Sequence, residues 1–260
     1  MDRIKENIPF ILLLIVMILF VFAFIVSETS LFDEEEIHTY TFEEAVSMQI
    51  SNDTDDLKLV NNMTEYANDN DIKNAMNMNS GNDYQFLRLD EVSGATVEQL
   101  NEELEGKGIL EGQGQAFYDA EQTHQVNAIY LIAHATLETG HGKSELASGI
   151  QVNNTVYYNF FGIGAFDHAA VLEGSSYAEQ ADWSTPARAI DGGAAFIRNN
   201  YINNKQNTLY RMRWNPQNPG THLYATDIEW AEKIAQLMNS HYNSLGLEPG
   251  ELDKDNYASE

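Results

Sequence analysis

The chain of 260 residues contains no cysteine. This absence excludes disulfide bonds, a thiol nucleophile and metal sites built from thiolates. An extracellular domain of this composition must therefore be stabilised by an ordinary hydrophobic core. The length is sufficient for one sizeable domain with appendages.

Basic residues are scarce, with 14 Lys and Arg against 40 Asp and Glu, and the formal net charge is -26. Nucleic acid is excluded as a partner, because binding phosphates requires Lys and Arg. Anionic lipid surfaces and anionic wall polymers would also repel this chain at low salt. The acidity fits either a salty habitat or a protein that a membrane anchor localises, and the sequence does not separate the two.

One long apolar run is present, the uncharged segment Ile8–Val26. At ~1.5 Å per helical residue it is long enough to cross a bilayer. A cleaved signal peptide is the alternative, but its apolar core would be shorter and would end in a small-x-small site. The run ends instead in Phe24-Ile-Val-Ser-Glu28. The sequence therefore favours an uncleaved transmembrane anchor.

The flanks of this run indicate its orientation. Arg3 and Lys5 precede it, and the next basic residue is Lys58. Basic residues stay cytoplasmic, so the short N-terminus is expected inside and the rest of the chain outside. A membrane-protein partner of the helix is an alternative to a plain anchor, although no polar residue or small-xxx-small face in the run indicates such an interface.

The rest of the chain changes composition in steps. An acidic stalk is followed by an Asn- and Asp-rich lead-in, which either packs on the main domain or is a disordered spacer. The last residues are polar and are expected to be frayed. The predicted divisions are a cytoplasmic N-terminus (1–7), the anchor (8–26), the stalk and lead-in (27–79), the main domain (80–245) and the tail (246–260).

Helical patterns dominate the main domain. Residues 150–183 differ, because aromatic and glycine residues alternate there, which favours short strands and loops. Helices are predicted over Thr96–Leu104, 112–123 and Asn127–Glu138. A further helix is expected to begin at Thr185-Pro186 and to contain the pair Gly192-Gly193, which would let another helix approach closely. The last predicted helix begins at a capping box, Thr226–Glu229, and ends near Tyr242. We expect an α+β fold with two lobes and a cleft between them.

The segment Ala133–Ser144, AHATLETGHGKS, ends a nearly uncharged helical run with one carboxylate, Glu138. Gly140 and Gly142 follow at once and favour a stop to the helix. A carboxylate that leaves an apolar helix is partly desolvated, so its neutral, proton-donating form is favoured. Such a group is suited to general acid catalysis. The alternative is a solvated residue in a C-terminal helical turn.

Aromatic residues are candidates to line a site around this carboxylate. Sugar rings bind by stacking on aromatic side chains and by hydrogen bonds from amides and carboxylates. Taken singly, each aromatic residue is also a good core residue. The candidates are Tyr158, Asn159, Phe161 and Gly162 in YNFFG, and Tyr210, Trp214 and Tyr224 around the turn-rich NPQNPG loop.

Four separated motifs carry a family resemblance: AHATLETGHGKS, NFFGI, NTLYRMRWNPQNPGTHLYATD and WAEKIA. They occur in this order between Tyr84 and Tyr242. At these motifs the chain resembles the glucosaminidase domain of bacterial cell-wall autolysins, glycoside hydrolase family 73. It is most similar to the domains of staphylococcal autolysins, and its anchor resembles that of membrane-bound cell-wall glucosaminidases.

The resemblance implies a lysozyme-like fold and a peptidoglycan hydrolase without a cofactor. The implied activity is that of an endo-β-N-acetylglucosaminidase, which cleaves peptidoglycan after N-acetylglucosamine. Tethered outside the membrane of a Gram-positive type envelope, such a hydrolase is expected to act in cell-wall remodelling and strand-length control. By position, Glu138 matches the catalytic acid, Asn159 and Phe161 match the NxFG-type motif, and Tyr224 matches the tyrosine of YATD. The alternatives are a muramidase or lytic transglycosylase, or a silent glycan-binding module.

Glycoside hydrolysis usually requires a second carboxylate. Asp167, Glu173 and Glu145 are candidates, and each is alternatively a solvated surface charge. In a substrate-assisted route the 2-acetamido oxygen of the sugar replaces that carboxylate. His134 lies one helical turn before Glu138, where a core or supporting role is expected, because no HExxH pattern or third ligand indicates a metal site.

Overall fold

The computed structural model describes residues 39–52, 54–142, 148–164 and 170–259. The described residues all belong to one compact unit, residues 38–260. The predicted anchor, Ile8–Val26, lies outside the described residues. Among the residues that are described, no helix is both long and apolar enough to span a bilayer.

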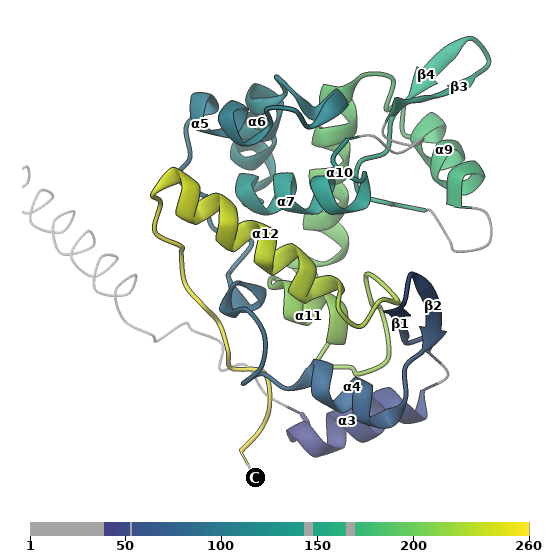
Figure 1. The fold of residues 1–260 in the computed structure, drawn as a ribbon, viewed down its shortest axis with the longest axis vertical. Helices are drawn as coiled ribbons and strands as arrows, with labels where there is room; N and C mark the ends of the chain where they lie inside the picture. Colours follow the sequence, from purple (N-terminus) through teal and green to yellow (C-terminus); the bar gives the residue numbers. More distant parts are fainter. Residues whose placement is uncertain (1–38, 53, 143–147, 165–169, 260) are drawn as a thin grey trace, which may run out of the picture. The chain divides into compact units, whose positions relative to one another are not determined.

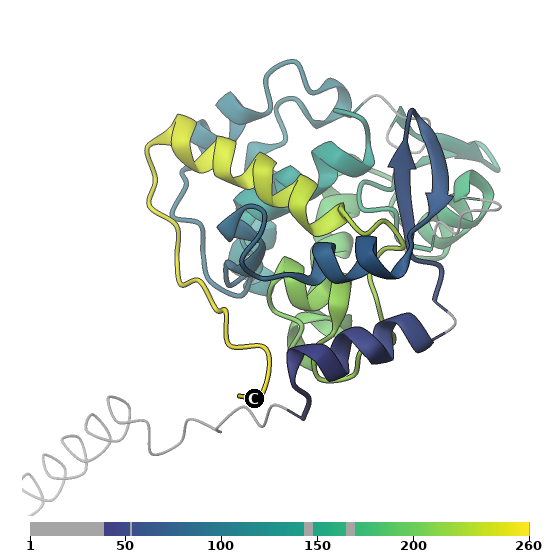
Figure 2. The ribbon, with the colours of Figure 1, turned by 60° about the horizontal axis from the view of Figure 1, so that its bottom comes forward.

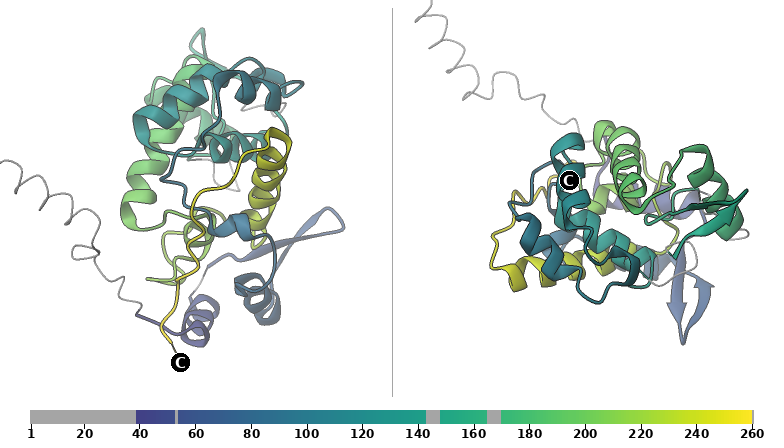
Figure 3. Two further views of the ribbon diagram at one scale, coloured as in Figure 1. Left: turned by 90° about the vertical axis from the view of Figure 1, so that its left-hand side faces the viewer. Right: turned by 90° about the horizontal axis from the view of Figure 1, so that it is seen from above.

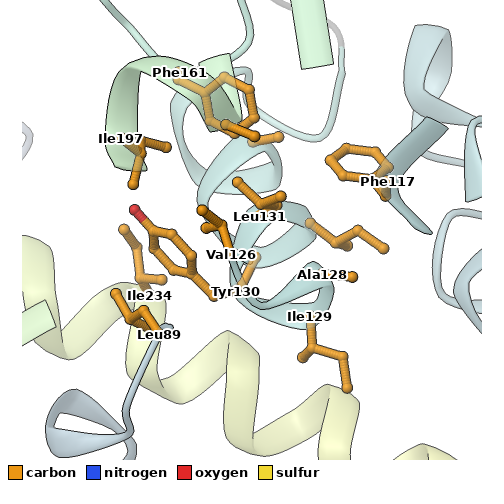
Figure 4. Packing of buried hydrophobic residues seen from close by; sticks show 14 of the residues in the cluster. Leu89, Phe117, Val126, Ala128, Ile129, Tyr130, Leu131, Phe161, Ile197 and Ile234 are labelled. Carbon is orange, nitrogen blue, oxygen red and sulfur yellow. The ribbon is translucent and has the colours of Figure 1, made fainter. Parts of the chain in front are cut away.

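Helix α7, Ala128–Glu138, lies at the centre of the main domain (Figure 1). Helices α6 and α12 pack against it, and α10 packs against α6. Side chains from several of these helices meet around Tyr130 and Leu131 of α7 (Figure 4). The surrounding helices are α5 (Val97–Glu103), α6 (Gly114–His124), α10 (Pro186–Asn200), α11 (Leu209–Trp214) and α12 (Trp230–Leu245), with single turns η2 (Asp83–Phe86), η3 (Gly108–Leu110) and η4 (Ile202–Asn204).

Every side chain of α7 from Ala128 to Thr136 is buried. The start of the helix is satisfied by polar groups that are themselves buried. The Asn127 side chain accepts a hydrogen bond from the backbone N–H of Tyr130, and the Glu121 carboxylate accepts one from that of Ala128 at 2.8 Å. Such capping removes the cost of burying unpaired backbone donors. The apolar run predicted to be a buried helix is confirmed.

The region expected to hold strands contains both a hairpin and a helix. Strands β3 (Ile150–Val152) and β4 (Thr155–Tyr157) pair in antiparallel register. Asn153 and Asn154 form the turn with positive φ angles, as a tight hairpin requires. Helix α9, Ala170–Gln180, follows. The prediction of strands and loops over 150–183 is therefore wrong for α9, in which Gly174 and Ala178 lie one turn apart and are both buried.

The lead-in region folds onto the main domain. It forms helix α3 (Phe42–Ser51), a hairpin of β1 (Leu57–Val60) and β2 (Met63–Tyr66), and helix α4 (Asp69–Met76) (Figure 2). A second core joins helices α3 and α4 to η2, to α11 and to the segment that precedes α12. Its buried members are Ala45, Val46, Ile72, Met76, Phe86, Tyr210, Trp214 and Ile228. The alternative of a disordered spacer is wrong for residues 39–52 and 54–76.

The C-terminal tail is bound rather than frayed, which corrects the expectation drawn from its polarity. It runs back along the domain and ends near α3 (Figure 3, left). The backbone N–H of Asp253 donates to the Phe86 carbonyl, and that of Ala258 donates to the Tyr40 carbonyl. The Arg211 guanidinium also binds the Asn256 side chain at 2.9 Å. Polar residues are ordered here because backbone and guanidinium groups supply their partners.

Two local predictions differ from the structure. The expected capping box at Thr226 is replaced by a turn in which Asp227 accepts the backbone N–H of Glu229, and α12 begins only at Trp230. The Gly192-Gly193 pair of α10 accommodates aromatic rings rather than another helix. A Cβ at Gly193 would lie 2.1 Å from the Phe161 ring.

We predict that Gly193→Ala destabilises the domain by about 1–3 kcal/mol, because the added methyl group overpacks the Phe161 ring. Helix propensity alone predicts that the same change raises the free energy of unfolding by about 1 kcal/mol. Urea unfolding measures the difference. Asn199→Ala, an exposed position of the same helix, is the control and should not destabilise. A Gly193→Ala protein as stable as the wild type would contradict the packing described.

Candidate functional site

Glu138 is the last residue of α7, and 27% of its side chain is exposed. The indole N–H of Trp230 donates to its Oε1 at 3.0 Å. The other oxygen, Oε2, faces Gly162, where a Cβ would approach it to 3.0 Å. Gly162 has a φ of +65°, so a glycine here serves both the backbone turn and the space beside the carboxylate. One carboxylate oxygen is held by a donor, and the other has no bulky neighbour on the Gly162 side.

Trp230 is a site residue to which sequence reasoning assigned no role. It opens α12, is almost fully buried, and stacks on Tyr224 with a centroid distance of 4.9 Å. The only sequence signal is that the WAEKIA motif begins with this residue. Its indole is the only tryptophan donor that the described residues place on Glu138.

His134 lies behind the carboxylate and is fully buried. Its Nε2 is 3.7 Å from Glu138 Oε1, and its Nδ1 is 3.0 Å from the Tyr130 hydroxyl. The rings of Phe161, Tyr224 and Trp230 contact its ring edge to face. His134 therefore supports the carboxylate from within the core. In the described parts of the chain no three metal-binding side chains come together.

Tyr224 stacks on Trp230 and also contacts His134, and its side chain is partly exposed. Its hydroxyl donates to the Phe161 carbonyl at 2.9 Å. Burial raises the pKa of the Tyr224 phenol well above its usual value, and the nearby Tyr130 and Glu138 raise it further. The phenol is thus neutral at any ordinary working pH. It is available as a fixed dipole beside the site rather than as a base.

Asn159 shapes the loop before Gly162. Its amide group donates to the carbonyls of Ile163 and Gly174, and its carbonyl oxygen accepts the backbone N–H groups of Phe161 and Ile163. The side chains of Asn159 and Phe161 are both buried. The expectation that they contact substrate is corrected: Asn159 folds the loop, and Phe161 supplies the carbonyl that holds Tyr224.

Tyr210 and Trp214 are core residues, which corrects their prediction as substrate-binding residues. Both side chains are buried in the second core. The Tyr210 hydroxyl bonds to the Met76 carbonyl and to the Tyr257 hydroxyl, so it is satisfied internally. These residues lie four apart, on the inner face of α11. Tyr158 is half-buried, with its backbone N–H bonded to the Trp183 carbonyl.

Of the three candidates for a second carboxylate, only Glu173 lies among the described residues, and no described contact joins it to Glu138. Glu173 is exposed on α9. Asp167 and Glu145 lie outside the described residues. The described site therefore consists of one partly exposed carboxylate, an indole donor, a neutral phenol and a glycine turn.

Residues 114–243 match the model of the glucosaminidase family, described as mannosyl-glycoprotein endo-β-N-acetylglucosaminidase. The bifunctional autolysin of Staphylococcus aureus strain MSSA476 is 48% identical over 193 residues, which are 69% of this chain and 15% of that protein. The chain thus spans a small part of this curated relative.

Solved structures match over most of the chain. A catalytic mutant of S. aureus Autolysin E, in complex with the disaccharide NAG-NAM, superposes with a TM-score of 0.79 at 45% identity, covering 85% of this chain and 98% of that one. S. aureus glucosaminidase B gives a TM-score of 0.64 at 39% identity, covering 81% and 87%. This chain belongs to the glucosaminidase family. It is a glycoside hydrolase with a lysozyme-like fold of helices and small sheets.

We predict that Trp230→Phe lowers kcat by about ten- to hundredfold, because a hydrogen bond to a charged group contributes about 1.5–3 kcal/mol. The phenyl ring keeps an aromatic face toward Tyr224 and removes the donor together with one ring of the indole. Trp183→Phe makes the same loss of ring volume and is the control, since this buried indole has no bond to Glu138 among the described contacts. Initial-rate measurements on both variants give the two kcat values to be compared. Unchanged kcat in Trp230→Phe would remove the indole from the catalytic site.

Proposed function

We propose that this protein cleaves peptidoglycan glycan strands after N-acetylglucosamine, at the β-1,4 bond to N-acetylmuramic acid, with Glu138 as the general acid. The observation that carries the proposal is the geometry of Glu138 at the end of a buried helix. Trp230 fixes one carboxylate oxygen, while Gly162 leaves room beside the other. An acid that protonates a glycosidic oxygen needs this combination of fixed orientation and access.

The relatives support this substrate. The Autolysin E structure holds a NAG-NAM disaccharide in a catalytic mutant in which alanine replaces a glutamate. A second Autolysin E structure, 46% identical to this chain, holds the muropeptide NAM-L-Ala-D-iGlu. A shared fold and a partly exposed glutamate make the same class of glycan the best substrate for this chain. A muramidase or lytic transglycosylase on the same fold is the second candidate.

For the mechanism we propose a substrate-assisted route. The 2-acetamido oxygen of N-acetylglucosamine attacks the anomeric carbon, while Glu138 gives its proton to the departing glycosidic oxygen. Water then opens the cyclic intermediate, and the Glu138 carboxylate takes the proton of that water. Tyr224, neutral and fixed by the Phe161 carbonyl, would orient the acetamido group. This route needs none of Asp167, Glu173 and Glu145 as a second carboxylate.

We also propose that the segment Ile8–Val26 anchors the enzyme in the cell membrane, with the catalytic domain outside. The acidic stalk of residues 27–37 would reach at most ~40 Å when fully extended. The enzyme would therefore cut only glycan close to the membrane, which supports a role in limiting strand length during cell-wall remodelling. A short tether fits a catalytic unit whose acidic surface does not bind anionic wall polymers.

The proposed bond specificity is tested by digesting purified peptidoglycan with the protein and with Glu138→Gln. Borohydride reduction labels the new reducing ends, which mass spectrometry identifies. We expect reduced N-acetylglucosamine ends from the wild type and none from the variant, since an amide cannot donate the required proton. Ends at N-acetylmuramic acid, or anhydro ends, would move the enzyme to the second candidate class. Full activity in Glu138→Gln would remove Glu138 from the acid role.

We predict that Tyr224→Phe lowers kcat/KM by about tenfold or more without changing the shape of its pH profile. The pKa of the phenol is raised well above its usual value, so it does not ionise in the working range and contributes no limb to the profile. Tyr210→Phe is the control, because it removes a buried hydroxyl from the second core and should affect stability alone. A lost alkaline limb in Tyr224→Phe would contradict a neutral role.

A further inference from the structure

A buried guanidinium lies beneath the segment that carries Tyr224 and Trp230. Arg213, on α11, is fully buried. Its Nε donates to the Asp227 carbonyl at 2.9 Å and its Nη2 to the Thr226 carbonyl at 3.0 Å. Nη2 also meets the Asp56 carboxylate at 2.5 Å. One side chain thereby joins the lead-in region to the backbone between the two aromatic residues.

Asp56 is likewise almost fully buried, and its orientation is fixed from within the lead-in region. The Gln49 side-chain amide donates to Asp56 Oδ2 at 2.9 Å, and the Thr54 hydroxyl lies 3.2 Å from the same oxygen. The carboxylate therefore uses Oδ2 to bind its own region and Oδ1 to bind Arg213. Its neighbour Leu57 begins strand β1.

Strand β1 adds a second attachment to the same segment. The backbone N–H of Leu57 donates to the Thr226 carbonyl, and the backbone N–H of Ile228 donates to the Leu57 carbonyl. We call residues 224–230 the site segment. Its middle is bonded to Arg213 and Leu57, while its ends carry the phenol fixed by Phe161 and the indole that donates to Glu138.

A buried ion pair is a poor means of gaining stability, because desolvating both charges offsets most of their attraction. Burial lowers the pKa of Arg213, and the charge of Asp56 opposes that shift. The need for an arginine at position 213 is better explained by the geometry of its hydrogen bonds than by a gain in stability. Its planar donors hold two consecutive carbonyls of the site segment at once, which a lysine ammonium cannot reproduce.

We propose that Arg213 and Asp56 form a positioning pair that sets the site segment, and through it Trp230 and Tyr224, against Glu138. Neither residue touches the carboxylate, so both act through the segment. Asp56, Leu57 and Gln49 precede residue 114, where the match to the family model begins. The active site of this chain thus depends on a region outside the matched family segment. The kinetic part of the test rests on the proposed function.

The test compares Arg213→Lys with Arg211→Lys in the full chain. Arg211 lies on the same helix and is also buried, but its guanidinium binds the C-terminal tail at Asp253 and Asn256. Both changes keep the charge and lose the fork. We expect Arg213→Lys to lower kcat on peptidoglycan more than tenfold with KM changed less than threefold. Arg211→Lys should lower the melting temperature while keeping kcat within twofold.

The indole N–H resonance of Trp230 gives a readout independent of turnover. The chain has three tryptophans, so assignment by single substitution is direct. We expect this resonance to move in Arg213→Lys and to stay in Arg211→Lys, since only the former displaces the donor to Glu138. A wild type that does not cleave peptidoglycan would refute the proposed function alone, because the resonance still tests the pair.

Asp56→Asn extends the test if Arg213→Lys does not fold, because the amide has the shape of the carboxylate. The double variant Asp56→Asn/Arg213→Lys should cost no more in kcat than the worse single variant if the two residues act as one unit. Wild-type kcat and an unmoved Trp230 resonance in a folded Asp56→Asn or Arg213→Lys protein would overturn the proposal. Equal kcat losses in Arg213→Lys and Arg211→Lys would overturn it as well.

Discussion

The structure depends on the burial of helix α7. Its side chains are enclosed from Ala128 to Thr136, and the helix ends at Glu138, where the chain meets solvent. Complete burial fixes the axis of the helix to within the tolerance of a close-packed core. The position of its last residue is fixed with it. Helices α6 and α12 cover α7 directly, and α10 packs against α6 from outside. The site lies at the end of α7, where Glu138 is partly exposed.

Three further segments complete the site at the end of α7. The loop at Asn159 is folded by its own amide group and supplies Gly162 and the Phe161 carbonyl. The segment of residues 224–230 supplies a phenol and an indole, which stack on each other. The buried His134 ring contacts both segments, through the rings of Phe161, Tyr224 and Trp230. Each group that faces Glu138 is thus held by a second contact, which is how a rigid site is preorganised.

The sequence was sufficient for the central helix and its carboxylate, because an uncharged run followed by glycine has few other interpretations. It also indicated the Thr96 and Thr185 caps, whose side chains accept the expected backbone N–H groups. It was not sufficient to separate aromatic residues of the core from those of the site. Tyr210, Trp214 and Tyr224 lie in one stretch of sequence, and only long-range packing places two of them in the second core.

The order of the polar segments could not be predicted from the sequence either, because it also depends on long-range contacts. The lead-in region and the tail are rich in Asn and Asp, which favours a prediction of disorder. Their order comes from partners far away in sequence, such as Arg213 for Asp56 and Arg211 for Asn256. Periodicity along the chain carries no signal of such pairs. Helix α9 was missed because its glycine and serines weaken the local pattern, although Ala178 is buried.

The central claim is that a glycan binds at Glu138, to which Trp230 donates its indole N–H, and not beside Trp214 or Trp183. The most direct measurement follows the three indole N–H resonances of folded Glu138→Gln protein during titration with a peptide-free glycan of alternating N-acetylglucosamine and N-acetylmuramic acid. The account predicts a saturable shift of the Trp230 resonance, with the other two unmoved. A shift confined to Trp214 or Trp183, or saturable binding that leaves Trp230 unmoved, would contradict it.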